Sequence, residues 1–145
     1  MLRVVVDANI WISALLNSRK ALAVVSLLEH DQFELICADA LIDELADVLT
    51  RPKFSSRINH SRRETLFELI REKARFVALP EVIDEICRDP KDDVYIVCAV
   101  VAQAEYLVSG DKDLLVLREH EGVKIVSLIT FVELFEEKQS RESND

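Results

Sequence analysis

The sequence predicts an α/β fold in which a parallel sheet of four to five strands carries helices on both faces. Half of the 145 residues are hydrophobic and only two are glycine, a composition typical of one compact, helix-rich domain. Short apolar runs alternate along the chain with longer segments whose apolar residues recur at helical spacing. Strands and helices that alternate form βαβ units, and right-handed crossovers bring the carboxyl ends of the strands to one edge of the sheet.

The first strand, predicted over residues 2–6, is a valine-rich run typical of a strand buried on both faces. It stops at Asp7, so this carboxylate stands at the edge where open α/β sheets bind their ligands. Asn9 is expected to cap the helix that carries Trp11 and Leu15. Asp7 alone is either a ligand-binding acid or only a cap or turn residue. Similar acids further along the chain favour the first interpretation.

The remaining elements follow from the apolar runs and the residues that interrupt them. Further strands are predicted over residues 33–37, 75–79, 106–109 and 123–126, and helices over 20–30, 38–51, 61–73, 92–104, 114–117 and 129–137. The helix from residue 38 ends before Pro52, and Ser61 with Glu64 matches a capping box. We expect a polar connection over 53–61, a loop over 80–90, and a polar tail over 138–145 behind a single domain of residues 1–137.

Four acidic residues fall at equivalent places beside the carboxyl edge of the predicted sheet. They are Asp7, Glu44, Asp92 and Asp111. One acid near a helix start is common, because it interacts favourably with the helix dipole, so each position alone is weak evidence. Glu44 is the most informative, since it lies among apolar residues such as Ile42 and Leu45 rather than plainly on the outer face of its helix.

Such a cluster of carboxylates predicts a site for a divalent cation. Clustered carboxylates repel one another, and burial penalises each charge further, so the cluster requires a compensating cation. Oxygen ligands without histidine or cysteine select hard ions such as Mg²⁺ or Mn²⁺. An ion held in this way can polarise a phosphate and activate water, which favours metal-dependent hydrolysis of a phosphodiester.

Several other classes of protein fit the sequence poorly. With only Gly110 and Gly122, no glycine-rich phosphate loop can be built, which disfavours P-loop and Rossmann nucleotide-binding proteins. The three histidines lie in polar contexts, which disfavours a catalytic triad, and the acids do not match a phosphotransferase or response-regulator pattern. No segment approaches 18 uninterrupted apolar residues, and the three cysteines have no metal-binding spacing. We therefore expect a cytoplasmic protein with reduced thiols and no membrane contact.

The charge of the chain is unevenly distributed. The formal net charge is −9, which argues against a simple nucleic-acid-binding module. Residues 51–75, however, carry eight basic side chains against three acidic ones, a local charge of +5 that leaves −14 on the remaining residues. This segment is either a solvated helical surface with scattered charge or a surface that faces phosphates, and the sequence favours neither.

Taken together, these motifs resemble the PIN domain, a metal-dependent nuclease fold related to flap endonucleases. The resemblance runs from the Val-Val-Val-Asp-Ala-Asn segment ending at Asn9 to the Ser-Gly-Asp-Lys-Asp segment ending at Asp113. Between them, the Arg-Pro-Lys-Phe segment at 51–54 and the Asp-Pro-Lys-Asp-Asp segment at 89–93 resemble PIN domains that act as toxins of prokaryotic toxin–antitoxin pairs. The resemblance implies a three-layer α/β/α fold, a homodimer, an antitoxin partner, and an endoribonuclease that uses Mg²⁺ or Mn²⁺.

The resemblance also implies roles for individual residues. Asp7, Glu44, Asp92 and Asp111 correspond to the catalytic, metal-binding acids of the family. Asn9 and Ser109 would orient them, and Asp113 is a further acidic candidate. Asp93 competes with Asp92 for the third position, and we prefer Asp92 because it follows Asp-Pro-Lys as in the family pattern. Helical phase does not decide between the two.

The basic residues and the overall activity are left as hypotheses. Arg51, Lys53, Arg62 and Arg63 are candidates to hold the RNA backbone, whether the RNA substrate is single-stranded or structured. The main alternative to a ribonuclease is a PIN-like scaffold that binds RNA or a protein without cleaving it. The complete set of acids disfavours that scaffold.

Overall fold

The structure is a computed structural model, and it describes residues 1–83, 85–86 and 90–135. Its centre is a six-stranded sheet in the order β3-β2-β1-β4-β6-β5. The strands are β1 (Leu2–Val6), β2 (Phe33–Cys37), β3 (Arg75–Phe76), β4 (Tyr106–Val108), β5 (Glu119–His120) and β6 (Val123–Val126). All neighbouring pairs are parallel except β5 and β6. The five predicted strands are therefore confirmed, and β5 is an additional one.

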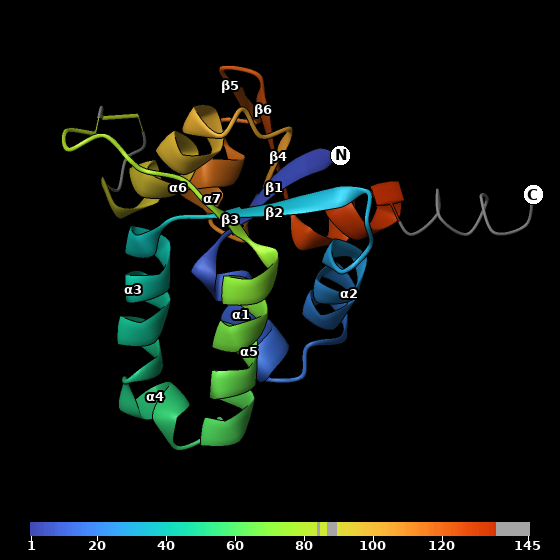
Figure 1. The fold of residues 1–145 in the computed structure, drawn as a ribbon, viewed down its shortest axis with the longest axis vertical. Coiled ribbons are helices and arrows are strands. Elements are labelled where there is room, and N and C mark those ends of the chain that lie inside the picture. Colours follow the sequence, from blue (N-terminus) through green and yellow to red (C-terminus); the bar gives the residue numbers. More distant parts are fainter. Residues whose placement is uncertain (84, 87–89, 136–145) are drawn as a thin grey trace, which may run out of the picture.

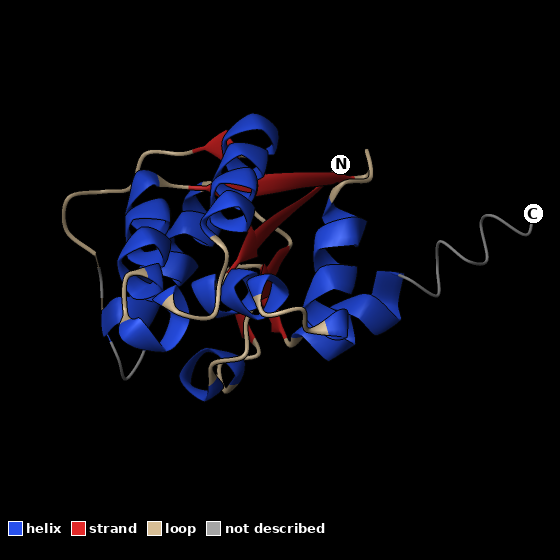
Figure 2. Cartoon of the chain, turned by 90° about the horizontal axis from the view of Figure 1, so that it is seen from below, coloured by secondary structure: helices blue, strands red, loops and turns tan. Residues whose placement is uncertain are grey.

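Seven labelled helices cover the two faces of this sheet, as the resemblance to a three-layer fold implies. They are α1 (Ala8–Leu15), α2 (Arg19–Leu28), α3 (Asp39–Leu49), α4 (Pro52–Ser55), α5 (His60–Lys73), α6 (Pro90–Val101) and α7 (Lys112–Leu115). The helix α6 packs against β1, β2, β4 and β6, whereas α2 and α5 pack against β2. Figure 1 shows α6 on one side of the sheet and α1, α2 and α5 on the other, and Figure 2 shows the strands enclosed between helices.

The core consists of the sheet and the apolar faces that pack against it. Val4, Val5 and Leu107 of the two central strands are fully buried, as the valine-rich pattern predicts. A last helix occupies residues 128–135 in the described part of the chain. Its Phe131 and Phe135 contact Phe33 and Tyr106, with ring centroids 4.9–6.0 Å apart across the group. This aromatic cluster fastens the helix to β2 and β4.

Three local predictions are corrected by the structure. Asp7, not Asn9, is the N-cap of α1. The helix α5 starts at His60 with Asn59 as its cap, so the capping box at Ser61 is not formed. Asn59 caps the helix instead of Ser61, because its side-chain oxygen accepts the backbone N–H of Ser61 at 2.7 Å and so satisfies a donor of the first turn. The connection predicted over 53–61 overlaps α4, which begins with Pro52 at its first position.

The remaining differences concern element length. The strand predicted over 75–79 is reduced to Arg75–Phe76, and the helix predicted from residue 92 already begins at Pro90. The additional strand β5 is polar and joins β6 through a two-residue turn, in which Glu121 and Gly122 have φ values of 47° and 86°. Positive φ at both positions is typical of a tight hairpin. Residues 136–137 of the predicted last helix and the tail over 138–145 lie outside the described residues.

Two further expectations bear on the chemistry of the chain. Cys37 and Cys98 are buried free thiols, and Cys87 lies outside the described residues. Burial raises the pKa of the Cys37 thiol to about 11 and that of Cys98 to about 12, so both thiols stay protonated at neutral pH.

No single helix in the described part of the chain is long and apolar enough to cross a membrane. Among the described helices, α1 and α2 meet that criterion as a pair, by length and composition, and they are bent by 114° relative to each other.

Candidate metal centre and active site

The four predicted acids come together at one cleft beside the carboxyl ends of β1 and β4. Asp7 follows β1 and Asp111 lies three residues beyond β4, while Glu44 comes from α3 and Asp92 from the first turn of α6. The cleft has a volume of about 320 Å³, within the range of small-ligand sites. It is lined by Asp7, Ala8, Asn9, Glu44, Val48, Arg51, Lys53, Phe54, Lys91, Asp92, Tyr95 and Asp111. The topology therefore assembles the acids from four separate elements.

Asp7 is both a helix cap and a buried acid of the cleft. Its backbone N–H donates to the carbonyl of Val108 at 3.0 Å, which continues the pairing of β1 with β4. Its Oδ1 accepts the N–H of Asn9 at 2.9 Å, and its Oδ2 accepts the hydroxyl of Ser109 at 2.6 Å. Burial raises the pKa of Asp7, the hydrogen bonds from Ser109 and Asn9 oppose that rise, and the charge of Asp111 adds to it. The two interpretations of Asp7 are thus compatible.

Ser109 connects the two acids that follow β1 and β4. Its side chain is fully buried, and its single hydroxyl proton is donated to Asp7. The same oxygen accepts the backbone N–H of Asp111 at 3.0 Å. Ser109 therefore links Asp111 to Asp7, and its role in orienting metal-binding acids stays a prediction.

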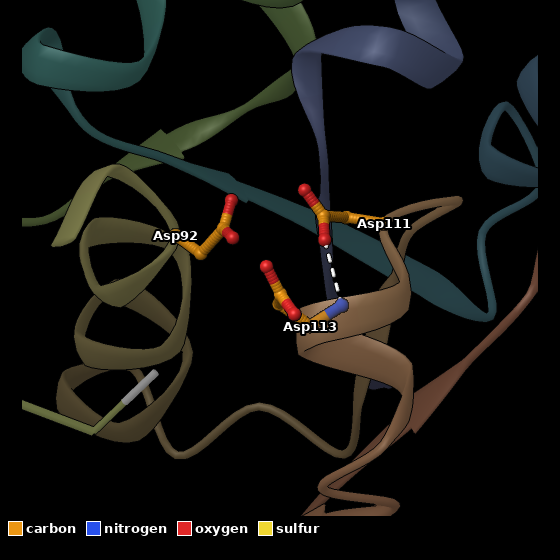
Figure 3. Close-up of side chains that lie close together, drawn as sticks. All are labelled: Asp92, Asp111 and Asp113. Atoms are coloured by element: carbon orange, nitrogen blue, oxygen red, sulfur yellow. Dashed lines mark hydrogen bonds between the residues drawn. The ribbon is translucent and has the colours of Figure 1, made fainter. Parts of the chain in front are cut away.

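Asp92, Asp111 and Asp113 form a tight group of carboxylates. One carboxylate oxygen from each lies within 4.8 Å of the other two. Figure 3 shows Asp92 on α6 facing Asp111 and Asp113 from across the site. Asp111 caps α7 and accepts the N–H of Asp113 at 2.8 Å through Oδ1. This spacing fits a shared divalent cation, because oxygens that ligate one ion lie close together.

The composition of the cleft fits a hard cation as well. Among the described residues, neither histidine nor cysteine lines it, and its acids offer only oxygen ligands. Such a ligand set suits Mg²⁺ or Mn²⁺ rather than Zn²⁺ or copper. The residues present therefore fit the ion that the sequence predicts.

Asp92 and Asp93 point to different surroundings. Asp92 lines the cleft and belongs to the carboxylate group with Asp111. Asp93 is buried, and its Oδ1 accepts the backbone N–H of Ile86 at 3.2 Å. Its carboxylate thus links Ile86 to α6. The geometry favours Asp92 as the acid that faces a ligand, and its role as a metal ligand stays a prediction.

Glu44 is held by a residue that the sequence did not reveal as part of the site. The hydroxyl of Tyr95 donates to Oε2 of Glu44 at 2.6 Å and accepts the N–H of Ala8 at 3.3 Å. Burial raises the pKa of Tyr95, and so does the bond to Glu44, so the phenol remains a donor. The available signal was its position three residues after Asp92, on the same helix face. In an apolar helix, however, a tyrosine is indistinguishable from a core residue.

The basic candidates fall into two groups. Arg51 and Lys53 line the cleft at the start of α4, and Lys53 lies 5.4 Å from the ring centroid of Phe54. Arg62 instead donates to the side-chain oxygen of Asn17 at 2.8 Å and borders a separate groove, between α1, α2 and α5. The structure does not bring Arg62 or its neighbour Arg63 to the cleft. A basic residue that sequence reasoning missed, Lys91, does line it, directly before Asp92.

The fold and this acidic cleft define an α/β protein with a candidate metal site, and comparison with known proteins identifies its family. A sequence model of the PIN domain matches residues 3–113, a range that includes all four acids, and the chain belongs to the PIN domain family. PIN domains are generally nucleases and typically bind divalent metals.

Two similar proteins span most of the chain. An uncharacterized protein of Methanocaldococcus jannaschii, MJ1680, is 25% identical over 126 residues, which cover 86% of this chain and 81% of that protein. The crystal structure of VapBC2 from Rickettsia felis bound to a DNA fragment from their promoter matches with a TM-score of 0.58 at 10% identity. That match covers 87% of this chain and 98% of the chain compared with it. At such low identity, the likeness shows a shared fold.

Proposed function

We propose that this protein is an endoribonuclease that depends on Mg²⁺ or Mn²⁺ and hydrolyses RNA phosphodiester bonds. The observation that carries the proposal is the cleft itself, in which four acids from four elements face the basic side chains of Arg51 and Lys53. The acidic side chains suit a divalent cation, and the basic side chains beside them suit the phosphates of an RNA backbone. Membership of a family of nucleases supports the same conclusion.

The acidic and the basic residues of the cleft have different parts in the proposed reaction. Asp7, Glu44, Asp92 and Asp111 would hold the cation, with Asp113 as a further acid beside Asp92 and Asp111. When bound, the cation supplies Lewis-acid polarisation of the phosphate and activates water. Arg51 and Lys53 would hold the flanking phosphates. In the hydrolysis, a water oxygen forms a new bond to phosphorus, the ester bond to the leaving oxygen breaks, and that oxygen gains a proton.

The orientation of the acids is supplied by hydrogen bonds within the protein. Ser109 and the N–H of Asn9 each hold one oxygen of Asp7, so this carboxylate cannot rotate freely. The same network continues to Asp111, whose N–H donates to the Ser109 hydroxyl oxygen and whose Oδ1 accepts the N–H of Asp113. Such preorganisation lowers the entropy lost when a ligand is bound.

We further propose that the protein is the toxin of a prokaryotic toxin–antitoxin pair, active in the cytoplasm as a homodimer. The segments at 51–54 and around Asp92 resemble such toxins, and a structural neighbour, VapBC2, is a toxin–antitoxin complex bound to promoter DNA. A small open reading frame beside the gene, whose product copurifies with this protein and suppresses its activity, is the expected finding.

Cleavage of labelled single-stranded RNA tests the activity directly. The wild type, Asp7→Asn and Asp43→Asn are each incubated with the RNA in the presence of Mn²⁺ or Mg²⁺, and again in the presence of EDTA. Asp43 is an exposed neighbour of Glu44 that does not line the cleft, so its variant is the matched control. We expect EDTA and Asp7→Asn to abolish cleavage and Asp43→Asn to preserve it.

The contrary outcomes are also informative. Cleavage that persists in Asp7→Asn would come from a contaminating nuclease and would remove the support for this site. If no RNA is cut with either metal, while RNA or a protein still binds, the chain is the non-cleaving PIN-like scaffold instead.

A further inference from the structure

Glu44 differs from Asp7 and Asp111 in the way its carboxylate is held. Asp7 and Asp111 are short side chains at helix N-caps, where backbone N–H groups of Asn9 and Asp113 fix one oxygen of each. Glu44 lies in the middle of α3, away from both ends of that helix, and its longer side chain has one more rotatable bond. An unrestrained glutamate would therefore adopt several orientations in the cleft.

The hydroxyl of Tyr95 supplies the missing restraint. Tyr95 is 2% exposed, lies on α6 and contacts Oε2 of Glu44 across the cleft at 2.6 Å. The phenol is itself oriented, because its oxygen accepts the N–H of Ala8, the first residue of α1. That N–H has no carbonyl partner within its own helix, so it is free to orient a side chain. One hydroxyl thus joins α1, α3 and α6 at the site.

We propose that Tyr95 is a positioning residue for Glu44, holding Oε2 so that the carboxylate keeps one orientation toward a cation. The assignment rests on the proposed metal-dependent function. A hydroxyl with one proton can donate to one carboxylate oxygen only, so the second oxygen of Glu44 remains available. Partners of this kind fix the orientation of metal ligands and contribute to affinity without touching the ion.

Direct titration of Mn²⁺, followed by electron paramagnetic resonance, measures this contribution without any assay of cleavage. We expect Tyr95→Phe, which removes one oxygen atom, to weaken Mn²⁺ binding by about 10- to 100-fold. Tyr106→Phe is the matched control, because the ring of Tyr106 packs against Phe131 and Phe135 on another part of the sheet. This control should bind Mn²⁺ like the wild type.

A double-mutant cycle separates positioning from a general structural effect. If Tyr95 acts through Glu44, then Tyr95→Phe should cause no further loss of Mn²⁺ affinity in a Glu44→Ala background. Equal losses in both backgrounds would mean that the phenol only supports the fold, and the assignment would be overturned. An unchanged affinity of Tyr95→Phe alone would overturn it as well.

Two more results complete the test. If Tyr95→Phe does not fold, Glu44→Asp is the second variant, since it keeps the charge and Tyr95 but withdraws the carboxylate from the hydroxyl. Mn²⁺ affinity of Glu44→Asp equal to that of the wild type would contradict the assignment. Wild-type protein that binds no Mn²⁺ would overturn the proposed function itself, and the assignment with it.

Discussion

Asp7 serves two purposes that oppose each other energetically. As an N-cap it stabilises α1, because its oxygen satisfies the N–H of Asn9. As a buried acid it destabilises the metal-free protein, because desolvation disfavours its ionised form and Asp111 adds repulsion. A strained charge of this type is typical of functional sites, where stability is lost in favour of ligand binding.

Asp7→Asn is therefore expected to stabilise the protein in EDTA, raising the Tm by a few degrees. Asparagine keeps a capping oxygen but carries no charge. The folded-state pKa of Asp7 is raised, so the folded protein is most favoured with Asp7 protonated and loses that stability as the pH rises through the folded pKa. Thermal unfolding of both proteins between pH 3 and pH 8 measures the effect.

The pH profile also supplies the control for this prediction. Below about pH 4, the ordinary pKa of an aspartate, Asp7 is protonated in both states, so the advantage of the asparagine variant should vanish. A constant advantage at every pH would show that the effect does not come from the charge. Asp43→Asn, at an exposed position, should change the Tm little.

At the scale of elements, long periodic segments were predictable and short ones were not. The predicted strands over 2–6 and 33–37 and the helices around Leu45 and Ile96 have enough apolar residues to show a pattern. The turn of helix α4 and the strand β5 do not, since they are four and two residues long. Their formation depends on Pro52 and on the turn at Gly122 rather than on periodicity.

The candidate site shows the same division. Asp7 and Asp111 follow strands, so parallel topology alone predicts that they meet at one edge of the sheet. Tyr95 reaches Glu44 only because α6 packs beside α3, and this contact is a property of the tertiary structure. Helical phase likewise could not separate Asp92 from Asp93, and the contact of Asp93 with Ile86 does so.

The basic residues at the start of α4 lead to a prediction of where RNA binds. Arg51 and Lys53 line the cleft, whereas Arg62 and Arg63 lie on α5 outside it. Replacing Arg51 and Lys53 by alanine should weaken RNA binding and reduce the slope of log K against log salt by about 1.4, or roughly 0.7 for each phosphate contact. Fluorescence anisotropy with labelled RNA in EDTA, at several salt concentrations, measures both quantities.

The matched variant replaces the same number of charges on α5. Arg62→Ala with Arg63→Ala should leave the salt slope close to that of the wild type, because Arg62 is engaged with Asn17 away from the cleft. If the α5 pair lowers the slope as much as the α4 pair, RNA extends along α5 and the cleft is only part of the binding surface. If neither pair changes the slope, none of these four side chains contacts the phosphates of the RNA.

For the molecule as a whole, the closely spaced acids couple metal binding to stability. The chain carries a formal net charge of −9, and the carboxylates of Asp92, Asp111 and Asp113 lie within 4.8 Å of one another. Repulsion among them opposes folding in the absence of a cation, since the unfolded chain separates these charges. A cation that binds only the folded state removes the repulsion and adds its own binding free energy.

Mn²⁺ at one hundred times its dissociation constant should therefore stabilise the wild type by about 2.7 kcal/mol, a rise in Tm of roughly 8 °C. Asp111→Asn retains an oxygen for the cap of α7 but offers no charge to the ion, so its rise should be much smaller. Sodium chloride at equal ionic strength separates specific binding from general screening. If sodium chloride raises the Tm as much as Mn²⁺ does, or if Mn²⁺ raises the Tm of Asp111→Asn as much as that of the wild type, the acids respond to screening and hold no ion. Specific binding requires the divalent ion and the full set of ligands, whereas screening requires neither.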